Sequence, residues 1–278
     1  MKSIVQLVRP YKYSALKRLL EPRKFHAFCL GTNKSGTHSI ANMFSKNYRA
    51  AHETDYARLI EAYLDYRESK ILEEKFVEVL KKYNTYAWLD LDSSHVHVEY
   101  LEFLLELYPR AKYILTIRDC YSWADSCFNH WINHELLDSW GRLHEWRYGR
   151  KTYDFNPEKE SALTEKNLYP LEGYFEAWAK HNNKVLSLVP KERLLVIKTS
   201  EISRQVDRIA DFLGVDSQAI NNERSHSFQA PQKHNLFAKL DPEYVKSKAE
   251  KHCSDLMSQF FSDCDYLEKL RQSSAQSS

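Results

Sequence analysis

The stretch KFHAFCLGTNKSGTHSIANMF, residues 24–44, decides the fold of this chain. Its apolar beginning predicts a short buried strand, and its last part places Ile40 and Phe44 on one helical face. Gly31 and Gly36 bracket the loop between the two. A strand that runs through such a loop into a helix gathers backbone N–H groups and the positive end of the helix around an anion. The stretch therefore predicts an anion-binding loop near the start of an α/β domain.

The lysine of this loop does not lie where an ATP-binding loop has it. In ATP-binding loops Lys-Ser/Thr follows the second glycine, and the hydroxyl group holds magnesium. Here Thr37 and His38 follow Gly36, and Lys34 lies inside the loop. The spacing therefore argues against a magnesium–nucleoside triphosphate and favours a donor with fewer phosphates in line.

Strand-like and helix-like segments alternate along the rest of the chain. Further strands are expected at residues 48–53, 85–92, 111–119 and 193–201, and helices at 39–47, 56–83, 98–108, 171–189 and 207–215. This alternation predicts a three-layer α/β sandwich around a mainly parallel sheet of about five strands. Ligands of such sheets bind at the carboxyl ends of the strands. Polar residues expected at or near these ends are Glu53, Asp90, Asp92, Arg118 and Lys198.

The composition is that of one globular domain. The 278 residues are 43% hydrophobic with a net charge of +2, which gives no indication of nucleic-acid binding. Five scattered cysteines match neither a disulfide framework nor a zinc motif, and they favour reduced thiols in the cytoplasm. We expect a single domain over residues 1–278, with a core at about 24–240 and a disordered tail at 271–278.

The N-terminal segment carries both leucines and basic residues. It lacks the uninterrupted apolar region of a signal peptide and any membrane span. A short basic amphipathic helix is compatible with it. Two interpretations stay open, contact with a membrane surface and a solvated surface helix, and the second is favoured.

Two segments together resemble the PAPS-dependent sulfotransferase superfamily, whose donor is 3′-phosphoadenosine 5′-phosphosulfate. Residues 34–38, KSGTH, are similar to the loop Lys/Arg-Ser-Gly-Thr-Thr/Ser of that family. TIRDCYSWADS, residues 116–126, supplies an arginine and, eight residues later, a serine, as in the segment that binds the 3′-phosphate. The likeness extends over residues 25–240, including VPKERLLVIKTSE and IADFLGV. It implies a P-loop NTPase-like fold and PAPS as co-substrate, with PAP as product and no metal.

The resemblance also implies a set of donor-binding residues. The 5′-phosphosulfate would contact Lys34, Ser35, Gly36, Thr37, His38 and Ser39, and the 3′-phosphate would contact Arg118 and Ser126. His38 and Ser39 depart from the hydroxyl and the aromatic residue of the cytosolic branch, so adenine stacking must come from elsewhere, with Trp123 as one candidate. The C-terminal Arg-Lys-Gly contact is missing as such, and Arg224 and Lys233 are the basic candidates in its place.

Sulfuryl transfer needs a cation at the departing oxygen and a base at the acceptor. Lys34 is the predicted cation, since charge develops on the bridging oxygen in the transition state. Family members use either a histidine or a carboxylate as base. The candidates, in order of preference, are Glu53, Asp92, His95 and His52. The metal-like spacings of His95 with His97 and of His130 with His134 have no third ligand, and no metal is expected.

The acceptor is inferred from charge and from an insertion. The aromatic stretch 128–155 interrupts the βα alternation, and a helical insertion at about 128–180 predicts a cap over the acceptor pocket, with plain core packing as the alternative. An acidic wall of Glu53, Asp55, Asp90 and Asp92 would favour a cationic small molecule, as in natural-product tailoring. The choice between O- and N-sulfation and the oligomeric state stay open.

Two other functions are compatible with the loop. One is a P-loop kinase of a nucleotide or small molecule, which the missing Gly-Lys-Ser/Thr argues against. The other is a non-catalytic PAP-binding protein, in which Lys34 would be dispensable.

Overall fold

A computed structural model describes residues 15–133, 138–149, 153–226, 234–266 and 268 of the chain. Its centre is a five-stranded sheet with the strand order β2-β3-β1-β4-β5, in which every neighbouring pair is parallel. The strands are β1 (Ala27–Cys29), β2 (Ala50–His52), β3 (Leu91–Ser93), β4 (Lys112–Ile117) and β5 (Leu194–Lys198). The predicted parallel sheet is thus confirmed.

The alternating side chains of β1 show how the sheet divides the core. Ala27 and Cys29 face a cluster built with α2 (Thr37–Phe44) and α10 (Val206–Leu213). Phe28 faces the opposite cluster. That cluster contains side chains of α3 (Tyr56–Arg67), α4 (Glu73–Ala87), α5 (Leu101–Leu107) and α9 (Leu171–Leu188). Because helices cover both faces, the domain has the predicted three layers.

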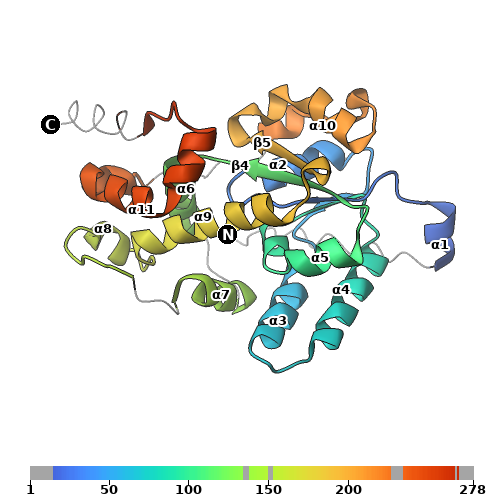
Figure 1. Cartoon of the computed structure of the whole chain (residues 1–278), viewed down its shortest axis with the longest axis horizontal. Helices are drawn as coiled ribbons and strands as arrows, with labels where there is room; N and C mark the ends of the chain where they lie inside the picture. The colour runs from blue at the N-terminus through green and yellow to red at the C-terminus, as the bar shows by residue number, and fades with distance from the viewer. Residues whose placement is uncertain (1–14, 134–137, 150–152, 227–233, 267, 269–278) are drawn as a thin grey trace.

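A third cluster extends the molecule beyond the sheet. Trp123, Phe128, Tyr174 and Trp178 pack there between helices and are essentially buried. The helical elements are α6 (Cys120–Asn133), α8 (Ser161–Thr164), α9, α11 (Pro242–Phe260) and the 3₁₀ turn Leu236–Lys239. Figure 1 shows α6, α8, α9 and α11 side by side at one end of the molecule.

The predicted helix 56–83 is two helices. The chain leaves α3 at Glu68, and Ser69 adopts a left-handed φ of 58° before α4 begins at Glu73. Both helices pack on the same core, so the apolar spacing continues across the break. For this reason the periodicity of the sequence alone did not reveal the break.

The predicted strand 85–92 is also displaced. α4 continues to Ala87, and Trp88 ends it with a left-handed φ of 48°. The strand itself is Leu91–Ser93. Asp90 therefore precedes β3 and lies at the amino edge of the sheet, not at the carboxyl edge as expected.

The remaining elements are mainly connectors. They are α1 (Ala15–Leu20), the 3₁₀ turns His95–Val98, Lys191–Arg193, Thr199–Arg204, Ser217–Ala219 and Asn222–His226, α7 (Asp138–His144) and the π-helical turn Glu145–Gly149. None of the helices in the described part of the chain is both long and apolar enough to cross a bilayer. The predicted tail 271–278 lies outside the described residues, and the division into core and insertion stays a prediction.

Candidate active site

The loop after β1 is held in shape by its two glycines. At Gly31 a Cβ atom would overlap the hydroxyl group and the carbonyl oxygen of Thr116 on β4. Gly36 has a φ of 103°, and a Cβ atom there would lie 2.5 Å from the Cδ1 atom of Ile202. Both positions need glycine, one for the close approach of two strands and one for the left-handed backbone. α2 begins at the next residue, Thr37, so its positive end faces the loop.

Ser35 ties this loop to its neighbours. It is fully buried, and its hydroxyl group donates to the carbonyl oxygen of Thr32 at 2.7 Å and lies 3.1 Å from the Thr116 hydroxyl oxygen. Thr199, directly after β5, donates from its hydroxyl group to the Ser35 carbonyl oxygen at 2.6 Å. The Ser35 side chain, predicted to contact the donor, is therefore engaged within the loop itself.

Lys34 lies half-buried at the turn of the loop. Its φ is 63°, a left-handed conformation uncommon for a residue with a side chain and typical of functional turns. Burial lowers the pKa of its ammonium group; the Cys127 thiol opposes this change and nearby Arg118 adds to it. A cation whose charge is already disfavoured gains most from a bound anion.

The arginine of the second motif meets the loop directly. Arg118 follows β4, the neighbour of β1, and donates from Nη1 to the Lys34 carbonyl oxygen at 3.3 Å. Its Nε donates to the Ser122 hydroxyl group at 2.8 Å. Ser126 lies half-buried one helical turn beyond Ser122 on α6. Lys34 and Arg118, 84 positions apart in the sequence, thus bring the two motifs together at one edge of the sheet.

Trp123 and Arg224 do not take the positions expected of donor contacts. Trp123 is 1% exposed and donates its indole N–H to the Asn33 carbonyl oxygen at 2.8 Å. It therefore supports the loop from the core side, and neither face of its ring is accessible to an adenine ring. Arg224 is exposed beside the far end of α2, where its Nη1 lies 3.3 Å from the Ser45 hydroxyl oxygen. Lys233 lies outside the described residues.

A network of polar side chains leads from the loop to the second and third strands. The Thr37 hydroxyl oxygen lies 3.1 Å from Nε2 of His52, at the end of β2. His52 Nε2 lies 3.8 Å from Oε1 of Glu53, which in turn lies 2.7 Å from Nδ1 of His95. His38 packs its ring edge-on against His52, with ring centres 5.2 Å apart. Ser39, behind it in α2, is buried.

The electrostatic environment of this network favours the charged form of its carboxylate and the neutral form of His95 and His38. Burial opposes ionisation of Glu53, but His52 and the hydrogen bond from His95 outweigh it and lower the pKa of Glu53 to about 2. Burial lowers the pKa of His95 despite the opposing effect of Glu53. Burial and the neighbouring His52 lower the pKa of His38 as well. At neutral pH the network therefore holds an ionised Glu53 beside a neutral His95.

An aromatic stack covers His95. The Trp140 ring of α7 is nearly parallel to the His95 ring, with centres 5.1 Å apart, and it stacks on Tyr56 of α3 at 4.8 Å. Arg142 anchors the same helix by ion pairs to three carboxylates of α3 and its end, Glu61, Asp65 and Glu68. Trp140, which belongs to the predicted insertion, thus contacts His95, one of the base candidates.

Asp92 and Asp90 lie apart from this network. Asp92 is 5% exposed, accepts from the Tyr83 hydroxyl group at 2.8 Å and lies 3.2 Å from Nε2 of His97, inside the core. Asp90 holds Arg49 through an ion pair of 2.7 Å at the amino edge. Asp55 pairs with Arg58 at 2.7 Å. The predicted acidic wall of four carboxylates is therefore not formed.

Sequence reasoning missed several residues of this site. Thr199 contacts Ser35, and Ser122 contacts Arg118. Trp140 stacks on His95, and Tyr56 stacks on Trp140. Thr199 and Ser122 follow strand ends, a signal that was present beside Lys198 and Arg118. No sequence signal joins Tyr56 to Trp140, because that contact depends on how α7 packs.

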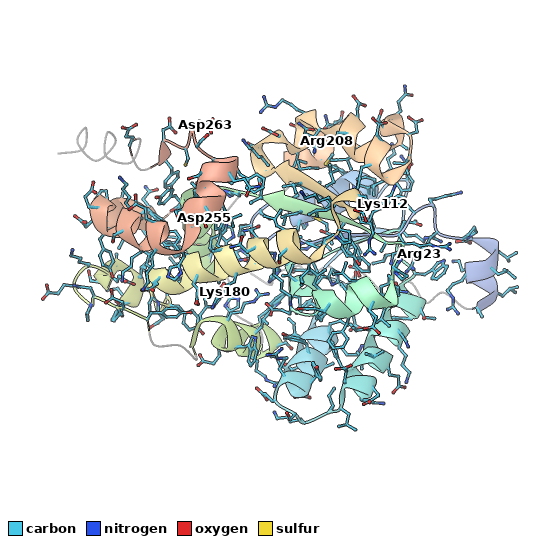
Figure 2. All side chains as sticks on the ribbon, in the orientation of Figure 1. Arg23, Lys112, Lys180, Arg208, Asp255 and Asp263 are labelled. Carbon is cyan, nitrogen blue, oxygen red and sulfur yellow. The ribbon has the colours of Figure 1, made fainter. Side chains whose placement is uncertain are left out.

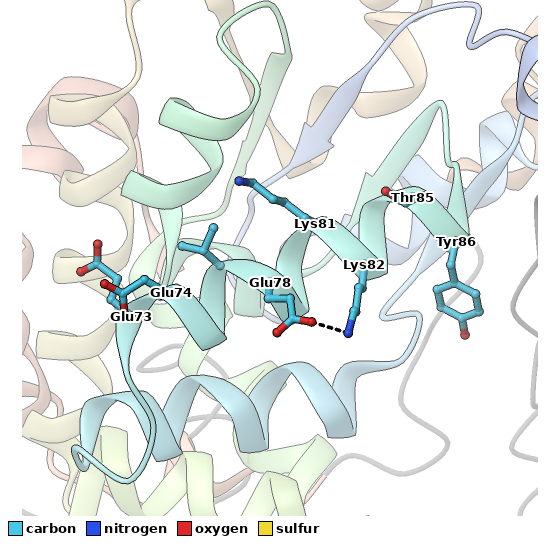
Figure 3. A pocket seen from close by; sticks show the side chains of 8 residues that line it. Glu73, Glu74, Glu78, Lys81, Lys82, Thr85 and Tyr86 are labelled. Carbon is cyan, nitrogen blue, oxygen red and sulfur yellow. Dashed lines mark ion pairs between the residues drawn. The ribbon is translucent and has the colours of Figure 1, made fainter. Parts of the chain in front are cut away.

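Other features of the described chain do not compete with this site. A surface hollow along α4 is lined by one helix, and Lys82 forms an ion pair with Glu78 there (Figure 3). No cluster of three or more potential metal ligands occurs among the described residues.

The comparisons with known proteins agree with this arrangement. A sequence model of the sulfotransferase domain matches residues 26–227, more than half of the chain, and the chain therefore belongs to this family. The predicted membership of the sulfotransferase superfamily is thus confirmed. No curated protein sequence matches the chain.

Solved sulfotransferases are among the structures that are similar to this chain. STF9 from Mycobacterium avium has a TM-score of 0.51 at 16% identity, with 89% of this chain and 79% of that chain covered. A sulfotransferase from Alicyclobacillus acidocaldarius has a TM-score of 0.47 at 17% identity, covering 88% of this chain and 98% of the other. Mouse SULT7A1 complexed with PAP has a TM-score of 0.39 at 16% identity, with 90% and 89% covered. The likeness to STF9 supports the fold.

Proposed function

We propose that this sulfotransferase transfers the sulfuryl group of PAPS to a hydroxyl or amino group of a small molecule and releases PAP. The observation that supports the proposal most is the meeting of the Lys34 loop with Arg118 at one sheet edge, beside the network of Glu53 and His95. Two cations, a glycine loop and a helix end suit a ligand with two separate phosphate groups.

Lys34 is the proposed catalytic cation. PAPS supplies a sulfuryl group on a phosphate oxygen, and transfer breaks that S–O bond while a new bond to the acceptor forms. The Lys34 ammonium group stabilises the charge that develops on the departing oxygen, an interaction stronger in the transition state than in the ground state. Arg118 and Ser126 hold the 3′-phosphate, and the guanidinium group is suited to paired hydrogen bonds with it.

His95 is the proposed base, with Glu53 as its partner. An ionised Glu53 accepts from Nδ1–H of His95, which leaves Nε2 with the lone pair that takes the acceptor proton. A carboxylate with a pKa of about 2 is itself a poor base near neutral pH. We therefore change the order of the candidates and place His95 before Glu53, with His52 as the link to Thr37.

The proposed acceptor is an uncharged small molecule with an accessible hydroxyl or amino group. The preference for a cationic acceptor rested on four carboxylates, of which Asp90 and Asp92 are engaged elsewhere and Asp55 pairs with Arg58. A single carboxylate among imidazoles does not attract a cation strongly. Natural-product tailoring remains a suitable setting. Five free cysteines, four of them buried, support a reducing compartment such as the cytoplasm.

Transfer of labelled sulfate from PAPS to a panel of neutral, cationic and anionic acceptors tests this function. We expect turnover, and we expect Lys34→Ala to lower kcat about a hundredfold or more, since one transition-state contact contributes about 3 kcal/mol. Lys166→Ala is the matched control. Lys166 is an exposed lysine outside the loop and the network, and its replacement should leave kcat unchanged.

Three outcomes would contradict the proposal. Absence of PAP and PAPS binding at micromolar levels removes the donor. Turnover of ATP with magnesium would favour a kinase. Tight PAP binding without any turnover, with Lys34→Ala unchanged, would favour a non-catalytic PAP-binding protein.

A further inference from the structure

The short helix α1 (Ala15–Leu20) turns an apolar face outward. Leu16, Leu19 and Leu20 are 67%, 78% and 71% exposed. Their spacing puts them on one side of the helix. Figure 1 shows α1 at the periphery of the molecule, beyond the sheet and its covering helices. Few large apolar side chains in the described chain are as exposed, so this concentration is unusual.

On the opposite side of α1, a charged side chain contacts the rest of the protein. Arg18 is the half-buried side chain of this helix; its Nη1 donates to the Thr85 carbonyl oxygen at 3.1 Å, and its guanidinium lies 5.6 Å from the centre of the Trp88 ring. An ordinary surface helix buries its apolar side and exposes its charges. The polarity of α1 is the reverse, so its leucines are presented to an external apolar phase.

The link between α1 and the domain fixes this orientation. Arg23 donates from Nη2 to the Asn84 side-chain oxygen at 2.7 Å and lies 4.3 Å from the centre of the Trp88 ring. The Trp88 indole N–H donates to the Glu21 carbonyl oxygen at 3.1 Å. Figure 2 shows Arg23 between α1 and the body of the molecule. The outward leucine face is therefore held by specific contacts on both sides of Glu21.

The first 24 residues of the sequence carry an excess of positive charge. Residues 1–24 contain one acidic residue, Glu21, and seven basic residues, which are Lys2, Arg9, Lys12, Lys17, Arg18, Arg23 and Lys24. The whole chain has 40 basic and 38 acidic residues, so residues 25–278 contain 33 and 37 and carry a net charge of −4 against +6 for the first 24. A basic segment with an apolar face is attached to an acidic body.

We propose that α1, with the basic residues of the first 24 positions of the sequence, docks this protein onto the surface of an anionic lipid bilayer. The leucine side chains would enter the headgroup region. The basic residues of this segment other than Arg18 and Arg23, which face the protein, would supply the positive charge that attracts the lipid phosphates and carboxylates. Anionic lipid fits both features at once. A second copy fits only the leucines, because two segments of +6 repel each other. The proposal does not depend on the reaction that the domain catalyses.

Co-sedimentation of the full chain with lipid vesicles tests the proposal. We expect binding to phosphatidylcholine vesicles that contain about one third phosphatidylserine, no binding to pure phosphatidylcholine vesicles, and weaker binding at higher salt. The variant Leu16→Ser/Leu19→Ser/Leu20→Ser should bind at least about tenfold more weakly. It should fold normally, as its melting temperature would show, since all three side chains are exposed.

Two matched controls separate a specific surface from general stickiness. Leu72→Ser removes a leucine that is 76% exposed at the start of α4 and should leave vesicle binding unchanged. Lys2→Gln/Arg9→Gln/Lys12→Gln should weaken binding to the anionic vesicles, whereas Lys81→Gln/Lys166→Gln, on other surfaces, should not.

Three results would overturn the proposal. The wild-type chain could fail to bind the anionic vesicles. The triple leucine variant could bind as well as the wild type. Third, the wild type could be a dimer that the leucine variant converts to a monomer without any vesicle binding, in which case a second copy covers this face.

Discussion

At the scale of single residues, the candidate site depends on the pair of Glu53 and His95. Both residues lie just beyond strand ends, and the backbone of Glu53 adopts a left-handed φ of 54°. That conformation is uncommon for glutamate. It accompanies a hydrogen bond from the Glu53 N–H to the Ser93 carbonyl oxygen at 2.9 Å, which attaches Glu53 to the third strand. The carboxylate and the imidazole are thereby held at 2.7 Å.

Replacement of His95 should affect chemistry more than binding. His95→Gln keeps a polar side chain but removes the base, and we expect kcat to fall about 10²- to 10⁴-fold with little change in KM. Glu53→Gln should lower kcat less and shift the acidic limb of the pH–rate profile. Steady-state kinetics against pH would measure both, with His252→Gln on α11 as control. Full activity of His95→Gln would refute its role as base.

The low pKa of Glu53 also predicts how stability depends on pH. The ordinary pKa of a glutamate is 4.5, and in the fold the pKa of Glu53 is about 2, against the opposing effect of burial. Its stabilisation is therefore complete above pH 4.5 and is lost as pH falls toward 2, with a magnitude on the order of 3 kcal/mol. In urea unfolding, Glu53→Gln should be less stable than wild type at about pH 6. The difference should shrink at about pH 3, and a constant difference would contradict the linkage.

At the scale of elements, the loop and α2 depend on the left-handed Gly36. Gly36→Ala meets both the strained φ of 103° and the Ile202 side chain, and we expect a loss of about 1–3 kcal/mol of stability and weaker PAP binding. Gly141→Ala is the matched control. Gly141 lies in helix α7, and a Cβ atom there would have no neighbouring atom within 4 Å. It should be neutral or stabilising by up to about 1 kcal/mol. Equal effects of the two variants in denaturant unfolding would contradict this account of the loop.

The elements that sequence predicted best are those whose local pattern and tertiary packing agree. The strand at 111–119 was expected and β4 is Lys112–Ile117, since its side chains are buried on both faces. The helix 56–83 was misjudged because two helices share one core and one periodicity. α11 was not predicted, although Asp241 caps it by accepting from the Tyr244 N–H at 2.7 Å and Pro242 opens its first turn.

The positions of site residues were predictable where a sequence motif determines the backbone conformation. They were less predictable where a side chain can pair with any of several neighbours. The loop and Arg118 were expected at one edge, and they meet there. Asp92 was a candidate base because it is the last residue of the predicted strand 85–92. In the structure its side chain faces the core and pairs with His97, a choice that the alternation of a three-residue strand does not reveal. Trp123 was a candidate for adenine stacking, but it lies on the buried side of the loop.

At the scale of the whole molecule, the proposed donor site joins two layers of the fold. Lys34 belongs to the loop between β1 and α2, whereas Arg118 begins the connection from β4 to α6, whose buried side belongs to the third core cluster. The two halves touch through the hydrogen bond from Arg118 to the Lys34 carbonyl oxygen. A ligand that binds both should therefore stabilise the sheet layer and the helical end together.

PAP should raise the melting temperature of the chain in a single transition. Ligand at a hundred times its Kd adds about 2.7 kcal/mol, which corresponds to a shift of several degrees for a domain of this size. Arg118→Ala and Lys34→Ala should each reduce the shift, because each removes a cation from one end of the bisphosphate. Arg224→Ala should keep the full shift, since that side chain lies at the far end of α2. A wild-type melting temperature unchanged by PAP, or an Arg118→Ala variant with an undiminished shift, would separate the two motifs and remove the basis for a shared site.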